Sequence, residues 1–206
     1  MGSSSSQAAQ QQQPAVPNAA SGTAQDPVQT PSRDRLTEGQ VRTVETNLKN
    51  MLSNPVCKNF VTGVLKELGK LPNGVYSTDL LDIFQAVRNQ TGGGIFLDKS
   101  LLPGHGNALG TVGKGNADIN LGDLTGPVAA HETIHVAAKS ETMISHVDMA
   151  RAAHASAAAM NLKVFLDLPK SENYKKPGAF SAASATYFAQ ALYDSCQRPN
   201  PVLVTK

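Results

Sequence analysis

The chain lacks tryptophan, has few aromatic residues and carries little excess charge. Of its 206 residues, 5% are aromatic and 17% are charged, and the formal net charge is +2. The core must therefore be built mainly from Ala, Leu, Val and Ile side chains. Lysine and arginine do not gather in blocks, so the charge does not indicate a nucleic-acid partner. No apolar run approaches the roughly 20 residues that cross a bilayer, so we expect no membrane span.

Cysteine is scarce as well, with only Cys57 and Cys196 present. They lie near the two ends of the part expected to fold, where a disulfide would join N-terminal and C-terminal helices. Two buried free thiols, as in a cytosolic protein, are the alternative, and the sequence leaves both open. A disulfide would favour a secreted or cell-surface protein.

Residues 1–36 have almost no bulky aliphatic side chains. They are mostly Ser, Gln, Ala and Pro, and their first residues resemble an added leader. Such a segment cannot bury enough apolar surface to offset the entropy of ordering, so we expect a disordered, low-complexity tail. Residues 37–206 are long enough to form one domain around a single core.

Residues 37–206 alternate between helical periodicity and short strand patterns. Thr37 and Gln40 form a capping-box pattern in front of apolar residues at helical spacing. We predict six helices, at 37–53, 56–69, 77–90, 125–139, 145–161 and 181–197. We also predict a three-stranded sheet, at 95–97, 108–112 and 117–121. The expected fold is α+β, mostly helical around a small central sheet.

One motif stands out among the helices. The segment His131-Glu132-Thr133-Ile134-His135 places two imidazoles at positions i and i+4, where both can bind one metal ion. Glu132 is offset by one residue, so its carboxylate can reach a metal-bound water without binding the metal. The flanking residues are apolar, and burying these three polar side chains without a shared task would be costly. The motif therefore predicts a zinc site.

The stretch 117–150 resembles the zincin metallopeptidases. The likeness rests on the motif and on the strand 117–121 in front of it. The resemblance implies that His131 and His135 are metal ligands and that Glu132 is the general base. It also implies that 117–121 is an edge strand that pairs with an extended substrate.

A looser likeness covers 144–150. The Ser145-His146 pair and the Met149-Ala150 step resemble C-terminal domains that follow RHS (YD) repeats in large bacterial surface proteins. This resemblance implies that the chain is part of a larger polypeptide.

A catalytic zinc ion needs a third protein ligand and one open position. His146 is our first choice, because imidazole is a good ligand and this residue follows Ser145 at the start of the next helix. Asp148 would suit an aspartate-type zincin. Glu141 has the offset of the third metzincin ligand, although metzincins have Gly where this chain has Ala138. His154 lies about 80° round the helix from His146, which favours packing or exposure.

Four other side chains are weaker candidates. His105 lies between two glycines, and we expect an exposed loop residue there. Tyr174, Tyr187 and Tyr193 each carry a phenol that could stabilise an oxyanion. We expect each of them to be an ordinary half-buried ring instead.

Together these residues predict a zinc-dependent hydrolase, most simply a peptidase. Zinc would be held by His131, His135 and His146, and Glu132 would activate a zinc-bound water that attacks a peptide or protein substrate. The alternative is a zinc-binding structural or interaction domain of a larger bacterial surface or toxin protein. In that domain a fourth ligand such as Asp148 would close the site. A metal-free helical domain is the third hypothesis.

Overall fold

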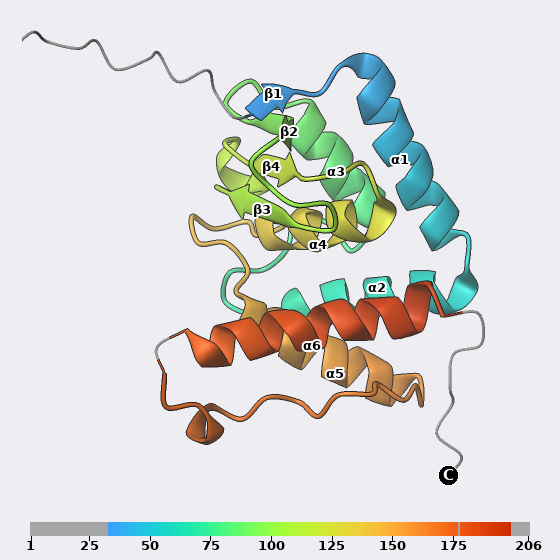
Figure 1. Ribbon diagram of the computed structural model, residues 1–206, viewed down its shortest axis with the longest axis vertical. Coiled ribbons are helices and arrows are strands. Elements are labelled where there is room, and N and C mark those ends of the chain that lie inside the picture. The colour runs from blue at the N-terminus through green and yellow to red at the C-terminus, as the bar shows by residue number, and fades with distance from the viewer. Residues whose placement is uncertain (1–32, 177, 199–206) are drawn as a thin grey trace, which may run out of the picture. The chain divides into compact units, whose positions relative to one another are not determined.

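A computed structural model describes residues 33–176 and 178–198. These residues form helices around a small mixed sheet, which confirms the predicted α+β class (Figure 1). The helices are α1 (Glu38–Leu52), α2 (Pro55–Leu68), α3 (Leu80–Arg88), α4 (Gly126–Val136), α5 (His146–Ala159) and α6 (Ala179–Cys196). Short 3-10 turns are η1 (Val112–Lys114) and η2 (Ser171–Asn173). None of the described helices has the length and apolar character of a membrane span.

The sheet has one strand more than predicted. Its strands are β1 (Arg33–Arg35), β2 (Gly94–Asp98), β3 (Gly106–Leu109) and β4 (Asp118–Leu121). They lie in the order β1-β2-β4-β3, with β2 and β4 parallel and both outer strands antiparallel to their neighbours. β4 is therefore an inner strand, and the prediction that 117–121 is an edge strand is wrong. The edge strand beside β4 is β3.

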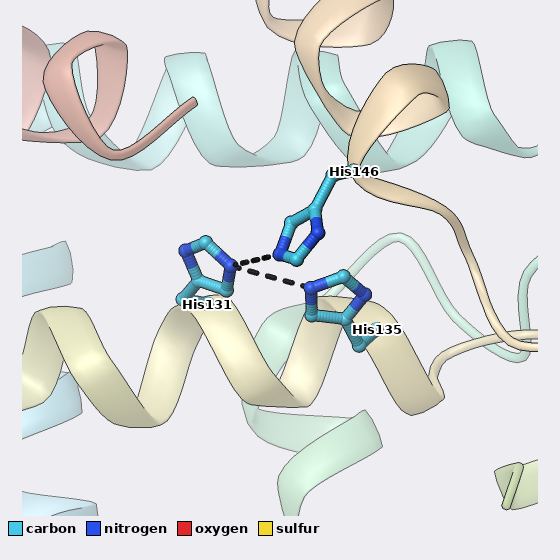
Figure 2. Close-up of side chains that lie close together, drawn as sticks. All are labelled: His131, His135 and His146. Atoms are coloured by element: carbon cyan, nitrogen blue, oxygen red, sulfur yellow. Dashed lines mark hydrogen bonds between the residues drawn. The ribbon is translucent and has the colours of Figure 1, made fainter. Parts of the chain in front are cut away.

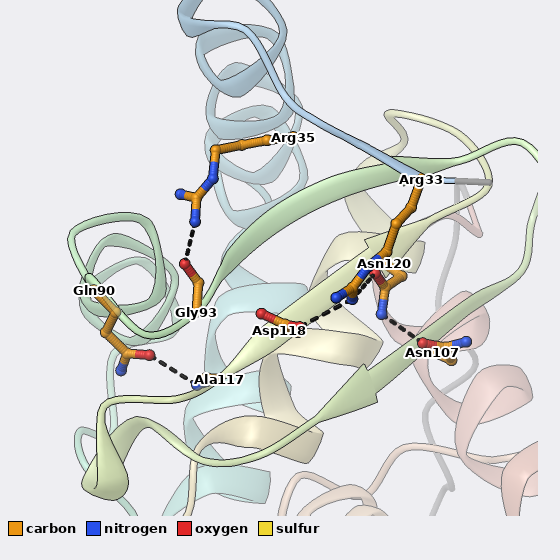
Figure 3. A network of polar contacts seen from close by, with 8 residues as sticks. All are labelled: Arg33, Arg35, Gln90, Gly93, Asn107, Ala117, Asp118 and Asn120. Atoms are coloured by element: carbon orange, nitrogen blue, oxygen red, sulfur yellow. Dashed lines mark hydrogen bonds and ion pairs between the residues drawn. The ribbon is translucent and has the colours of Figure 1, made fainter. Parts of the chain in front are cut away.

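β1 comes from the end of the segment assigned to the tail, so the folded part begins before residue 37. Arg33 donates to the Asp118 carboxylate at 2.9 Å and to the Asn120 side-chain oxygen at 3.0 Å (Figure 3). Its guanidinium also lies 4.5 Å from the ring centroid of Phe96. Asp118 is 85 positions from Arg33 in the sequence, so no local pattern predicts this strand. The rest of the tail prediction, 1–32, lies outside the described residues.

The helix ends follow their capping residues. Thr37 and Gln40 form the predicted capping box at the start of α1. α3 begins slightly later than predicted, because the Asp79 side chain accepts a hydrogen bond from the backbone in its first turn. α6 begins slightly earlier than Ser181, after Gly178, whose φ of +79° is one that other residues rarely adopt.

The helices fall into two groups. α3 and α4 pack with the strands, and α1 packs on α4 and α3; these helices and the strands are called the sheet group below (Figure 1). α2, α5 and α6 pack on one another and are called the helical group. Within the helical group, Gly63 of α2 lies so close to Ser156 of α5 that there is no room for a Cβ. The Ser156 hydroxyl donates to the carbonyl oxygen of Phe60 at 2.9 Å, so the contact is both close and hydrogen-bonded.

The two cysteines form a disulfide, with an S–S distance of 2.11 Å. Cys57 lies in the first turn of α2 and Cys196 is the last residue of α6, so the bridge joins two members of the helical group. No free cysteine remains in the described chain. The disulfide alternative is therefore confirmed over the free-thiol one.

Candidate metal centre

α4 carries the histidine motif through the interior of the sheet group. Thr125 is its N-cap residue, as predicted, and Pro127 lies in its first turn. Most of the helix is buried because it packs on α1, α3, β3 and β4. It ends at Val136, earlier than predicted, because the carbonyl groups of the following residues accept hydrogen bonds from other segments and not from the helix. The carbonyl oxygen of Ala137, for example, accepts from the backbone N–H of Tyr76 at 2.8 Å.

Three imidazoles meet between α4 and the start of α5 (Figure 2). The Nε2 atom of His131 lies 3.2 Å from Nε2 of His135 and 3.3 Å from Nε2 of His146. Nitrogen ligands about 2.0–2.1 Å from a tetrahedral zinc ion stand about 3.3–3.4 Å apart, so these two distances are close to that geometry. The structure thus brings the favoured third ligand to the two motif histidines.

The loop between the second and third histidines is closed by two hydrogen bonds. The backbone N–H of Ile144 donates to the carbonyl oxygen of His135 at 2.9 Å. In return, Nδ1 of His135 lies 2.6 Å from the carbonyl oxygen of Ile144, so this nitrogen carries the hydrogen. The Nε2 lone pair of His135 is then free to face the cluster. We call this pair of hydrogen bonds the His135–Ile144 clamp. Ser145 caps α5 directly after it, which places His146 at the first helical position.

Burial keeps the three histidines in the form that binds metal ions. Burial, aided by the nearby His135 and His146, lowers the pKa of His131 to about 3. Burial likewise lowers the pKa of His135 to about 4, although its hydrogen bond to Ile144 acts in the opposite direction. The pKa of His146 is lowered for the same reason. Since neutral imidazole is the ligand form, the donor set fits a zinc ion.

Glu132 lies beside the cluster with its side chain against β3. The residue is only 6% exposed, and burial raises the pKa of its carboxyl to about 8. A Cβ at Gly106 would collide with the Glu132 side chain, so this close approach requires glycine. Among the described residues, no hydrogen bond or ion pair to the Glu132 carboxyl is found. The structure thus places a buried carboxyl, with no partner found among the described residues, beside the three imidazoles.

Two cavities open beside Glu132. The first, of about 360 Å³, lies against α6 and is called the α6 cavity; its lining includes Pro127, Val128, Ala185, Thr186, Ala189 and Leu192. The second, of about 440 Å³, lies against the loop that precedes α5 and is called the loop cavity; its lining includes Asn107, Ala108, Thr142, Met143, Ile144 and Ser181. Both are also lined by Gly106, Glu132 and His146, so they meet at the histidine cluster.

The other candidates for the third ligand lie outside the cluster. Asp148 accepts a hydrogen bond from the Ser145 hydroxyl at 2.7 Å, within the N-terminal turn of α5. Glu141 is exposed and forms an ion pair with Lys114. Neither carboxylate belongs to the group of possible ligands found in the described chain, so no fourth protein ligand closes the site.

Of the weaker candidates, only His105 lines one of the two cavities. His105 is exposed, as expected, but it also lines the α6 cavity. His154 is exposed, and its Nδ1 lies 3.1 Å from the hydroxyl of Tyr187, which is fully buried. Tyr193 is exposed and Tyr174 lies partly buried elsewhere. None of the three tyrosines lines either cavity, so the structure gives no support for a tyrosine at an oxyanion.

α6 contributes to the centre in a way that sequence reasoning missed. The ring of Phe188 stands edge-on to His131, with 5.1 Å between centroids. Ala185 and Ala189, one helical turn apart, form part of the cavity wall. The only sequence signal is small residues at helical spacing, which equally describes a helix packed against another helix.

No protein family, curated protein or solved structure matches the chain. Any function must therefore be argued from the site itself.

Proposed function

We propose that the chain is a zinc-dependent hydrolase that cleaves peptide bonds. The observation that carries the proposal is the cluster of three histidines, in which Nε2 of His131 lies 3.2 Å and 3.3 Å from Nε2 of the other two, beside a buried, unpaired glutamate. A zinc ion bound there would act as a Lewis acid that polarises a carbonyl group and acidifies a water molecule. No fourth protein ligand is found in the described chain, which supports an open coordination position rather than a purely structural site.

The residues of the chain supply the remaining chemistry. Glu132 is positioned to take a proton from the attacking water and to return it to the leaving nitrogen. His131, His135 and His146 would hold the metal; the His135–Ile144 clamp orients His135, and Phe188 packs on His131. Fixed ligands and a base at hand are what a hydrolytic site requires.

The edge strand supports a peptide as the substrate. β3 pairs with β4 along one side only, so its other side is available for hydrogen bonds with an extended chain. Gly106 at the start of β3 touches Glu132, which brings a peptide along this strand close to the base. In this proposal β3 has the role that the zincin resemblance implied for 117–121.

Zinc analysis together with a single substitution tests the proposal. We expect about one equivalent of zinc per chain, and we expect Glu132→Gln to retain it. The same variant should lose at least about 100-fold in cleavage of a quenched-fluorescence peptide library, because the base is gone. Glu141→Gln is the matched control and should keep wild-type activity. Full activity of Glu132→Gln would rule out the proposed base, and failure to bind zinc would rule out the site.

We also propose that the chain works outside the cytosol. The support is the Cys57–Cys196 disulfide, since cytosolic reductants keep most cysteine pairs reduced. Alkylation of the protein in its native cells, before any reduction, checks this: two blocked thiols per chain would contradict the proposal.

A further inference from the structure

The two cavities differ in their walls but share one boundary. The α6 cavity is walled by α6 and by the first turn of α4, and the loop cavity by the 142–145 loop and by β3. Glu132 and His146 line both. A chain that passes Glu132 can therefore extend into a cavity on each side of the bond to be cleaved.

The charges of the cavity linings indicate whether the end or an internal segment of a substrate polypeptide can bind. Apart from Glu132, neither cavity is lined by a lysine, arginine, aspartate or glutamate of the described chain. A free carboxylate taken from water needs a cationic partner, and a free amine needs an anionic one, or the desolvation goes uncompensated. Apart from Glu132, which is assigned as the base, and the exposed His105, the linings offer no charged partner to a chain terminus, whereas an internal segment brings no terminal charge.

The α6 cavity also selects the kind of side chain. Val128 and Leu192 give it apolar walls, and Ala185 and Ala189 stop at Cβ, which leaves the space open. Its volume of about 360 Å³ exceeds that of any single apolar side chain. Burying a large apolar side chain there would strengthen binding by about 10-fold to 100-fold.

We propose that the substrate is an internal segment of a polypeptide, bound across Glu132 and His146 with a bulky apolar side chain in the α6 cavity. This inference rests on the proposed function. It makes the chain an endopeptidase rather than an enzyme that trims chain ends, and it makes Ala189 a residue that determines specificity.

Binding of small hydroxamates to the zinc-loaded full chain tests the inference without any turnover. The probes are succinyl hydroxamates capped as amides, with a benzyl group, a hydrogen or a carboxymethyl group at the side-chain position. By calorimetry we expect the benzyl compound to bind at least about tenfold more tightly than the hydrogen compound. The carboxymethyl compound should gain nothing, and neither should a benzyl compound whose terminal amide is replaced by a free carboxylate.

Variants of α6 locate the effect. Ala189→Leu fills the cavity and should bring the ratio of benzyl to hydrogen affinity down to about one. Ala182→Leu, on an exposed position of the same helix outside both linings, should keep the wild-type ratio. Ala185→Leu serves as the second filling variant if Ala189→Leu does not fold.

Each negative outcome contradicts one specific claim. An unchanged ratio in the filling variants, or no gain from the benzyl group, overturns the assignment of the cavity. A gain of tenfold or more from the free carboxylate overturns the endopeptidase assignment. If the hydrogen compound itself does not bind the zinc-loaded chain, the proposed function fails, which is a result distinct from the other two.

Discussion

The sheet group and the helical group contribute unequally to the candidate metal centre. The sheet group supplies His131, Glu132 and His135 from one helix, at a spacing that the sequence alone fixes. The helical group supplies His146 from α5 and a cavity wall from α6, and both depend on how these helices pack. Part of the site is thus set by spacing along one helix and part by the packing of other helices. Mutations in these two parts should have different effects.

The largest effect is expected from removing a ligand in either group. His131→Ala and His146→Ala should each lower zinc affinity at least about 100-fold, because two imidazoles alone hold zinc weakly. A competition assay with a chromogenic chelator measures this loss. Asp148→Asn is the control and should bind zinc like the wild type. Wild-type affinity in His146→Ala would show that the helical group supplies no ligand.

Removing the disulfide should destabilise the helical group more than the sheet group. The double variant Cys57→Ala/Cys196→Ala releases a link between residues 139 positions apart and should lower the free energy of unfolding by about 2–4 kcal/mol. Urea titration measures the change. Hydrogen exchange should then quicken in α2 and α6 before it quickens in α4. Uniform quickening across both groups would contradict the distinction.

Proton release on zinc binding should distinguish the base from the ligands. At pH 7 most of the Glu132 carboxyl holds its proton, since its pKa is about 8 without metal, and a nearby cation favours the ionised form. Wild type should therefore release about one proton more than Glu132→Gln, and the difference should shrink toward pH 9. His131 and His135, with pKa values of about 3 and 4, are already neutral and add little.

Calorimetry in buffers of different ionisation enthalpy measures these protons. Equal release by the wild type and Glu132→Gln at pH 7 would show that the carboxyl is already ionised before zinc binds.

The smallest effect is expected at the polar face of the sheet. Arg33→Ala removes the ion pair with Asp118 and the contact with Phe96, but the Arg33 side chain is 39% exposed. Such pairs contribute about 0–1 kcal/mol, so the free energy of unfolding should change within that range. Zinc affinity should stay at the wild-type value. A loss of zinc binding would show that β1 supports the centre, against the division drawn above.

Local patterns in the sequence are enough to predict the helix starts to within a few residues, and the motif. Thr37 with Gln40, and the i, i+4 pair His131 and His135, act within one or two helical turns, so they need no knowledge of the rest of the fold. The α+β class follows from the same kind of information.

Long-range features are predicted less well. The position of His146 depends on the packing of α5 near α4, so the sequence left Asp148 and Glu141 as alternatives. The strand order places β4 between β2 and β3, and local patterns do not show this pairing of distant segments, so the edge position that the zincin resemblance implied for 117–121 was wrong. β1 was missed because it is held by a contact 85 positions away. Phe188 and Ala189 reach the site only because α6 packs against α5 and α2.

The His135–Ile144 clamp has a consequence for how this chain can vary. Because both of its hydrogen bonds join residues 135 and 144 directly, the segment between them is a closed loop. Ala137 and Ala138 in this loop are buried and hydrogen-bonded to the rest of the fold, whereas 139–142 lie nearer the surface. Residues added or removed at 139–142 would leave the two ends paired and His146 two positions beyond the clamp, so the spacing between the second and third histidines can vary there in related sequences. A search pattern for such sequences should leave that gap open and require the helix cap before the last histidine.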